Sequence, residues 1–171
     1  LFLSSAYAIA EHMESVSAKL LEMGIDIEEG DDFIRVNASN PIKGVNVKTL
    51  PYPGFPTDLQ PQVSALLSLA EGTSIITESV WDNRFQYIDE LKRLGADVKV
   101  EGRVAVIKGI RKFTGAKVCA TDLRAGAGLV LAALAAEGET TITNVKYIDR
   151  GYEAIEKKLN EMGADIKRVK I

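Results

Sequence analysis

Two aspartates in this sequence stand where acid–base chemistry is possible. Asp58 and Asp122 each follow a threonine and precede a run of small and apolar residues, 63–70 after the first and 125–136 after the second. A buried carboxylate at such a helix start is most often a structural cap for the free backbone amides. It can also serve as a general base. The repetition of the Thr-Asp pair, and the arginines around it, keep the second hypothesis open.

Basic residues recur at matching places in the chain. Arg84 and Arg150 stand just before two of the expected amphipathic helices, His12 holds that place before another, and Arg124 belongs to the second Thr-Asp loop. A planar guanidinium binds the paired oxygens of a carboxylate or phosphate. The pattern is equally consistent with a site for an anionic substrate and with Asp–Arg salt bridges that pin the loops.

The composition argues against several classes of site. With 21 Lys and Arg against 24 Asp and Glu, the net charge is −3, so no polyanion-binding surface of the nucleic-acid type is expected. Cys119 is the only cysteine, which excludes an internal disulfide and a zinc knuckle, and the single histidine, His12, leaves no basis for a Ser-His-Asp or Cys-His arrangement. No apolar run approaches the ~20 residues of a membrane span. The length of 171 residues suits one domain.

Three segments share one pattern of helix, glycine and strand. Apolar residues recur at helical spacing, a glycine follows where a helix would stop in the left-handed conformation, and an alternating segment comes next. The expected helices are 14–23, 87–94 and 154–162, the stops are Gly24, Gly95 and Gly163, and the alternating strands are 25–28, 96–100 and 164–169. In the first two copies a second strand, 33–36 or 104–107, closes a hairpin.

The Thr-Asp loops belong to the other half of the repeat. There we expect a strand, the loop, an apolar helix and another strand; the strands are 45–48 and 74–78 in one copy, and 116–119 and 140–144 in the next. The chain therefore holds about two full repeats plus parts of a third. The apolar helices are expected inside and the Lys- and Glu-rich helices outside, which predicts an α/β fold with buried helices surrounded by mixed sheets.

Four segments carry a resemblance to a known family. They are Pro-Tyr-Pro-Gly-Phe-Pro-Thr-Asp-Leu-Gln-Pro-Gln (51–62), Thr-Glu-Ser-Val-Trp-Asp-Asn-Arg-Phe (77–85), Ala-Thr-Asp-Leu-Arg-Ala (120–125) and Tyr-Ile-Asp-Arg-Gly-Tyr (147–152). From about residue 11 to the end, the chain closely resembles the UDP-N-acetylglucosamine 1-carboxyvinyltransferases of the enolpyruvyl transferase family. The resemblance implies an inside-out α/β barrel, with three βαβαββ-type units per domain and two such domains around a cleft.

The resemblance also implies a domain assignment. Residues 1–171 are expected to form a single domain, most of the C-terminal catalytic domain of a two-domain enzyme. Residues 1–10 depart from the family pattern, which we interpret as a cloning or truncation boundary. In the family, the other domain carries a mobile loop with a reactive cysteine, which Cys119 does not match, and the Lys-Asn pair and further arginines that complete the anion site. Half of the active site would then lie outside this chain, which is expected to be inactive alone.

The family reaction transfers an enolpyruvyl group from phosphoenolpyruvate to the 3-hydroxyl of UDP-N-acetylglucosamine, the first committed step of peptidoglycan synthesis in the cytoplasm. It needs no metal or other cofactor. By resemblance, Asp58 contacts the sugar hydroxyl as the proposed general base, and Val80 makes a backbone contact to the sugar nucleotide. Arg84, Arg124 and Arg150 match the arginines around phosphoenolpyruvate. Asp122 matches a second active-site aspartate, with a catalytic and a positioning role both open.

Two alternatives remain at this stage. Within the same fold, 3-phosphoshikimate 1-carboxyvinyltransferase is the nearest rival, although it is expected to lack the strings at 55–60 and 148–152. The second alternative is a non-catalytic domain that binds a sugar nucleotide or a protein partner. Neither alternative calls for a membrane or a nucleic acid.

Overall fold

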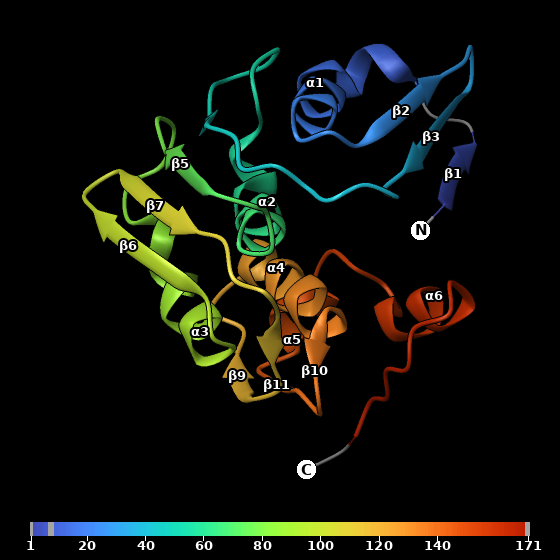
Figure 1. The fold of residues 1–171 in the computed structure, drawn as a ribbon. Helices are drawn as coiled ribbons and strands as arrows, with labels where there is room; N and C mark the ends of the chain where they lie inside the picture. Colours follow the sequence, from blue (N-terminus) through green and yellow to red (C-terminus); the bar gives the residue numbers. More distant parts are fainter. Residues whose placement is uncertain (1, 7–8, 170–171) are drawn as a thin grey trace.

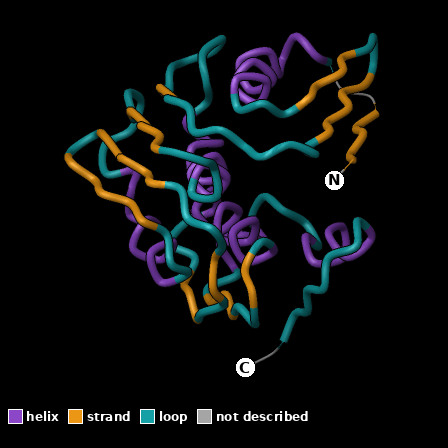
Figure 2. The backbone as a smooth tube through the Cα atoms, viewed as in Figure 1, coloured by secondary structure: helices purple, strands orange, loops and turns teal. Residues whose placement is uncertain are grey.

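Two apolar helices form the centre of the molecule (Figure 1). The computed structural model describes residues 2–6 and 9–169. Helix α2 (Gln60–Leu67) and helix α4 (Leu123–Leu134) pack against each other, and most of their residues are buried. Figure 2 shows strands distributed around these two helices rather than between them. The predicted arrangement of buried helices surrounded by sheets is confirmed.

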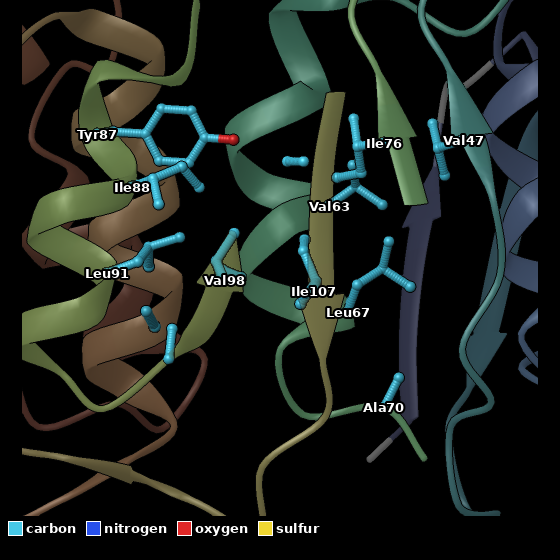
Figure 3. Packing of buried hydrophobic residues seen from close by; sticks show 14 of the residues in the cluster. Val47, Val63, Leu67, Ala70, Ile76, Tyr87, Ile88, Leu91, Val98 and Ile107 are labelled. Atoms are coloured by element: carbon cyan, nitrogen blue, oxygen red, sulfur yellow. The ribbon is translucent and has the colours of Figure 1, made fainter. Parts of the chain in front are cut away.

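A four-stranded sheet covers one side of α2. Its order is β4-β5-β7-β6, formed by β4 (Val47–Lys48), β5 (Thr73–Thr77), β7 (Val104–Lys108) and β6 (Asp97–Glu101). The β4–β5 pair is parallel and the other two pairs are antiparallel. Alternation along the strands turns Ile76 and Ile107, both fully buried, toward α2, where they pack with residues such as Val63 and Leu67 (Figure 3).

The first repeat builds a separate sheet beside the centre. Helix α1 (Glu14–Glu22), preceded by the short η1 (Ala10–Met13), leads into β2 (Asp26–Glu29) and β3 (Phe33–Asn37), which pair antiparallel as the predicted hairpin. Strand β1 (Phe2–Ala6) adds to the free side of β3, in the sheet order β1-β3-β2. The segment that departs from the family pattern thus contributes backbone pairing to this sheet.

The remaining elements are short and lie around α4. Two parallel pairs join β9 (Lys117–Cys119) to β11 (Thr141–Thr143) and β8 (Phe113–Thr114) to β10 (Ala136–Glu137). The other helical segments are η2 (Thr57–Leu59), η3 (Arg84–Tyr87), α3 (Ile88–Arg93), α5 (Lys146–Asp149) and α6 (Ile155–Glu161). No helix of the described residues is long and apolar enough to cross a bilayer.

The three predicted helix ends are confirmed, whereas one predicted strand does not form. Gly24, Gly95 and Gly163 follow α1, α3 and α6 with φ of 86°, 100° and 94°, the left-handed conformation predicted for all three. The strand expected at 164–169 is wrong, because no strand forms there. A strand is held by hydrogen bonds to a neighbour, and this copy lacks the second hairpin strand that pairs with the first one in the other two copies.

Helix α4 is less enclosed than its apolar sequence predicts. Leu131 and Leu134 are 46% and 42% exposed. Leu131 lines an apolar groove of about 350 Å³, together with residues of α1 and α2 such as Leu20 and Leu66. The helix lies inside as predicted, except on the groove side, where no described residue covers it.

Close contact between the two central helices depends on Gly128. A Cβ atom at Gly128 would lie 2.9 Å from the backbone carbon and oxygen of Pro61 in α2, whereas one at Gly126 would meet the side chain of Ile148. Alanine normally stabilises a helix by about 1 kcal/mol over glycine. For Gly128→Ala we expect the clash with rigid backbone to reverse the sign, and the free energy of unfolding to fall by about 1–3 kcal/mol.

Chemical denaturation of Gly128→Ala, with Gly126→Ala as the matched control, tests this expectation. A methyl group at Gly126 would also clash, 2.5 Å from Cγ1 of the buried Ile148 side chain, so this control compares a clash with a side chain to a clash with helix backbone. A Gly128→Ala protein as stable as the unmodified chain would show that α2 and α4 are not held at this distance.

Candidate active site

Asp58 joins two arginines from distant parts of the chain. Its Oδ1 accepts a hydrogen bond from Arg84 Nη2 at 3.3 Å, and its Oδ2 accepts one from Arg124 Nη2 at 2.7 Å. Arg84 is the first residue of η3 and Arg124 lies in the first turn of α4. The structure therefore brings together three of the six predicted site residues through a single carboxylate.

The Asp58 carboxylate is open to solvent, although the sequence analysis expected a buried group. Its side chain is 54% exposed, that of Arg124 is 40% exposed and that of Arg84 only 14%. Each carboxylate oxygen can accept more than one hydrogen bond, so both keep capacity for a ligand. The hydrogen bond from Arg124 to Asp58 raises the pKa of this guanidinium above its ordinary value. The cluster is preformed and accessible.

Arg84 belongs to a short helix, η3, that is bonded to the protein core. Its Nη2 also donates to the Thr57 carbonyl at 3.3 Å. Tyr87, at the end of the same short helix, is buried; its hydroxyl donates to Gln60 Oε1 at 2.9 Å and lies 2.6 Å from Ser64 Oγ in α2. Figure 3 shows this hydroxyl pointing at α2. Burial raises the pKa of the Tyr87 phenol, so the group stays neutral and fixes η3 to α2.

The two aspartates of the repeat, Asp58 and Asp122, make different hydrogen bonds. Asp122 is the N-cap of α4, and its Oδ1 accepts from the backbone amides of Arg124 at 2.8 Å and Ala125 at 2.9 Å. Asp58 makes no capping bond. At the equivalent positions, the Gln60 amide bonds to the Thr57 carbonyl, and Pro61 has no N–H to offer. The cap hypothesis is confirmed for Asp122 only; proline frees Asp58 to bind the arginines.

Arg150 is not part of this cluster of contacts. It follows α5, its side chain is exposed, and no described residue forms a hydrogen bond or ion pair with it. The segment that follows it lies near the starts of both central helices: Gly151 is packed against Leu123, and the Tyr152 hydroxyl accepts from Gln62 at 3.4 Å. The loop is thus fixed beside the site while the Arg150 guanidinium remains available to a ligand.

Val80 lies in the loop after β5, and its backbone amide is already used. The amide donates to Glu78 Oε1 at 2.8 Å, and the side chain is 38% exposed. A backbone contact from Val80 to a ligand therefore has to come from its carbonyl oxygen.

Glu78 is the charged residue that the sequence analysis missed. It is 1% exposed, and four donors converge on its carboxylate: the hydroxyls of Thr49 and Thr57 and the amides of Val80 and Trp81. Burial alone would raise its pKa, but these hydrogen bonds outweigh burial, and the pKa lies below its ordinary value. The signal was present, because Glu78 continues the buried alternation of Ser74 and Ile76 along β5.

The predicted site gathers charges of both signs. Three guanidinium groups (Arg84, Arg124 and Arg150) are matched in number by the carboxylates of Asp58, Asp122 and the buried Glu78. The exposed guanidinium groups of Arg124 and Arg150 can pair with the phosphate or carboxylate oxygens of a substrate. Among the described residues, no group of three or more His, Cys, Asp or Glu side chains could hold a metal ion.

Sequence comparisons place this chain in a known family. The family model EPSP synthase (3-phosphoshikimate 1-carboxyvinyltransferase) matches residues 7–159. A protein named UDP-N-acetylglucosamine 1-carboxyvinyltransferase 2 from Clostridium acetobutylicum is 58% identical over 163 residues, which are 95% of this chain and 39% of its own length. One named UDP-N-acetylglucosamine 1-carboxyvinyltransferase from Desulfofundulus thermocisternus is 56% identical over 94% of this chain and 66% of its own length. The chain thus spans about two fifths of the first of these curated relatives.

Solved structures share the fold. The enolpyruvyl transferase NikO from Streptomyces tendae superposes with a TM-score of 0.85 at 34% identity, over 92% of this chain and 36% of that one. EPSP synthase from Acinetobacter baumannii gives a TM-score of 0.77 at 19% identity, over 98% of this chain and 43% of that one. The expected enolpyruvyl transferase architecture is confirmed.

Proposed function

This chain belongs to the EPSP synthase (3-phosphoshikimate 1-carboxyvinyltransferase) family, and from that premise we propose that it is part of a transferase that moves an enolpyruvyl group from phosphoenolpyruvate to the 3-hydroxyl of UDP-N-acetylglucosamine. The observation that carries the proposal is the Asp58 carboxylate, which Pro61 leaves uncapped and which meets Arg84 and Arg124 on an accessible surface. The curated relatives with this name, at 56–58% identity, support the choice of acceptor.

In the proposed reaction Asp58 is the general base. The sugar hydroxyl attacks C2 of phosphoenolpyruvate and loses its proton to Asp58, while C3 of the enol is protonated. Loss of phosphate from the tetrahedral intermediate, with release of a proton from C3, then leaves the enol ether. A base is needed at the first step because a neutral hydroxyl is a weak nucleophile, and an exposed carboxylate with free lone pairs can reach it.

The arginines stabilise charge in this scheme. Phosphoenolpyruvate carries a carboxylate and a phosphate, and negative charge remains on both through the intermediate. Arg84 and Arg124 are held in place before substrate arrives, so little reorganisation is needed when charge develops. Arg150 supplies a further guanidinium that no described residue occupies. We assign these three side chains to the phosphoenolpyruvate anion, and the Val80 carbonyl to the sugar nucleotide.

Asp122 receives a positioning role within this proposal. Its Oδ1 caps α4 and accepts from the amide of Arg124, so it orients the very residue that pairs with Asp58. A direct catalytic role for Asp122 stays a prediction from the family resemblance.

We further propose that the chain is most of the C-terminal domain of a two-domain cytoplasmic enzyme of peptidoglycan synthesis, which uses no metal or other cofactor. The partial span of its relatives supports this assignment. The other domain would complete the anion site, and closure of the two domains would expel water from the reaction. Phosphoenolpyruvate is therefore expected to bind this chain only weakly on its own.

Phosphate release from phosphoenolpyruvate tests the proposal directly. In the full-length enzyme that contains this chain, release should occur with UDP-N-acetylglucosamine as acceptor and not with shikimate 3-phosphate. The reverse preference would identify the activity that gives the family model its name. Binding of the sugar nucleotide without phosphate release from either acceptor would support a non-catalytic domain.

A further inference from the structure

We propose that Glu78 is a positioning residue for the transfer reaction, because its buried carboxylate ties the loop that presents Asp58 to the loop that presents Val80. This inference rests on the proposed function for its role in catalysis. The contacts themselves do not depend on it.

One oxygen of Glu78 organises the loop after β5. Oε1 accepts from the Thr49 hydroxyl at 2.7 Å, the Val80 amide at 2.8 Å and the Trp81 amide at 3.0 Å. Thr49 also accepts from the Ser79 amide at 2.9 Å. Three successive amides of the loop are thus bound, directly or through Thr49, to one fully buried group. The direction of the Val80 carbonyl is a consequence of these bonds.

The other oxygen holds the Asp58 loop. Oε2 accepts from the Thr57 hydroxyl at 3.0 Å, and the carbonyl of this same threonine accepts from Arg84 at 3.3 Å. Asp58 is the next residue in the chain. Thr57 therefore links the buried Glu78, which its hydroxyl contacts, to the adjacent Asp58 and to Arg84, which its backbone carbonyl contacts.

A carboxylate suits this position better than a neutral side chain. Burying a charge is costly unless hydrogen bonds compensate for lost water, and four donors do so here. No Lys or Arg of the described residues forms an ion pair with Glu78, so its charge is not used for a salt bridge. A carboxylate only accepts hydrogen bonds, and all its neighbours at this point are able to donate. The geometry fits a device for orienting two loops.

A substitution at Thr57 can remove the bond from Glu78 to the Asp58 loop and leave the bonds to the Val80 loop intact. Thr57→Val preserves the shape of the side chain and removes only the hydroxyl that reaches Glu78. Thr57→Ser keeps the hydroxyl and is the matched control. In Glu78→Gln, Oε1 can still accept from Thr49, Val80 and Trp81, while the new amide group faces Thr57, whose hydroxyl can turn to accept. Glu78→Gln should consequently be milder than Glu78→Ala.

Steady-state kinetics of the full-length enzyme with UDP-N-acetylglucosamine test the inference. A misplaced catalytic group commonly costs about 10–100-fold, so Thr57→Val should lower kcat by at least about tenfold. The KM for the sugar nucleotide should change by less than about threefold, and Thr57→Ser should restore kcat. A role in stability alone would lower the melting temperature and leave kcat at 25 °C unchanged. That result, or failure of Thr57→Ser to restore kcat, overturns the inference.

Amide hydrogen exchange of this chain separates the inference from the proposed function. Glu78→Ala should speed exchange at Val80 and Trp81, whereas Thr57→Val should leave these two amides protected and speed exchange only around Asp58. Unchanged exchange in Glu78→Ala overturns the inference even if the enzyme is active. If the unmodified enzyme fails to transfer to UDP-N-acetylglucosamine, the proposed function falls, and the exchange pattern alone then decides whether Glu78 links the loops.

Discussion

Asp58→Asn in the full-length enzyme that contains this chain should reduce kcat by about 10²–10⁴-fold, the usual contribution of a general base. An amide cannot take the proton of the sugar hydroxyl. It also turns an N–H₂ group toward Arg84 or Arg124, where the carboxylate accepted hydrogen bonds at 3.3 and 2.7 Å. Because Asp58 is exposed and caps no helix, the free energy of unfolding should hardly change.

Asp122→Asn is the matched control for this experiment. Asparagine is as good an N-cap as aspartate, so α4 and the orientation of Arg124 should be preserved. If Asp122 only positions, most of the activity survives in this variant. Near-normal turnover of Asp58→Asn would remove Asp58 from the role of base, and a large loss in Asp122→Asn with an intact fold would assign catalysis to Asp122.

Arg150→Lys should impair the use of phosphoenolpyruvate without affecting the fold. The Arg150 guanidinium has no partner among the described residues, so its contribution should be made to the ligand. A single ammonium cannot reproduce the planar, two-pronged contact of a guanidinium with a carboxylate. A charge-assisted hydrogen bond contributes about 1.5–3 kcal/mol, so kcat/KM for phosphoenolpyruvate should fall by about 10–100-fold.

Arg111→Lys provides the control, since Arg111 is also exposed and forms no hydrogen bond or ion pair with a described residue, but lies in the loop before β8. Its kinetics should match those of the unmodified enzyme. Unchanged kinetics in Arg150→Lys would count against its assignment to the substrate anion.

Most of the architecture could be predicted because it depends on local signals. Gly24, Gly95 and Gly163 end helices in the left-handed conformation, and the alternating segments that follow Gly24 and Gly95 form hairpins because a second strand comes after each of them. Segment 164–169 has the alternating pattern but no second strand to pair with, and it does not form a strand. Periodicity shows which residues are able to form a strand, whereas the hydrogen bonds of the ladder require a neighbour.

The sequence predicted which residues belong to the site better than it predicted the contacts among them. The sequence indicated Asp58, Arg84 and Arg124, but their meeting through one carboxylate depends on how η3 and α4 are placed against α2. The different fates of Asp58 and Asp122 were visible in the sequence, since proline stands three residues after one and alanine three residues after the other. Glu78 was missed because a glutamate at a strand end is usually exposed, and only its phase with Ile76 indicates burial.

The proposed transfer reaction explains features that a purely structural domain would not need. If the arginines only formed salt bridges that hold the loops, an exposed Arg150 without a protein partner would not be needed. Pro61, which prevents Asp58 from capping its own helix, would not be needed either. Both features leave polar groups available on the side of the molecule where the central helices begin.

Titration of this chain with UDP-N-acetylglucosamine, followed by amide chemical shifts in NMR, tests most directly whether it carries part of the sugar-nucleotide site. We predict shifts clustered around Asp58, Val80 and Arg84, and smaller ones for the same ligand in Asp58→Asn. A folded spectrum without shifts at millimolar ligand would contradict the assignment of Asp58 and Val80 to a sugar-nucleotide site in this chain.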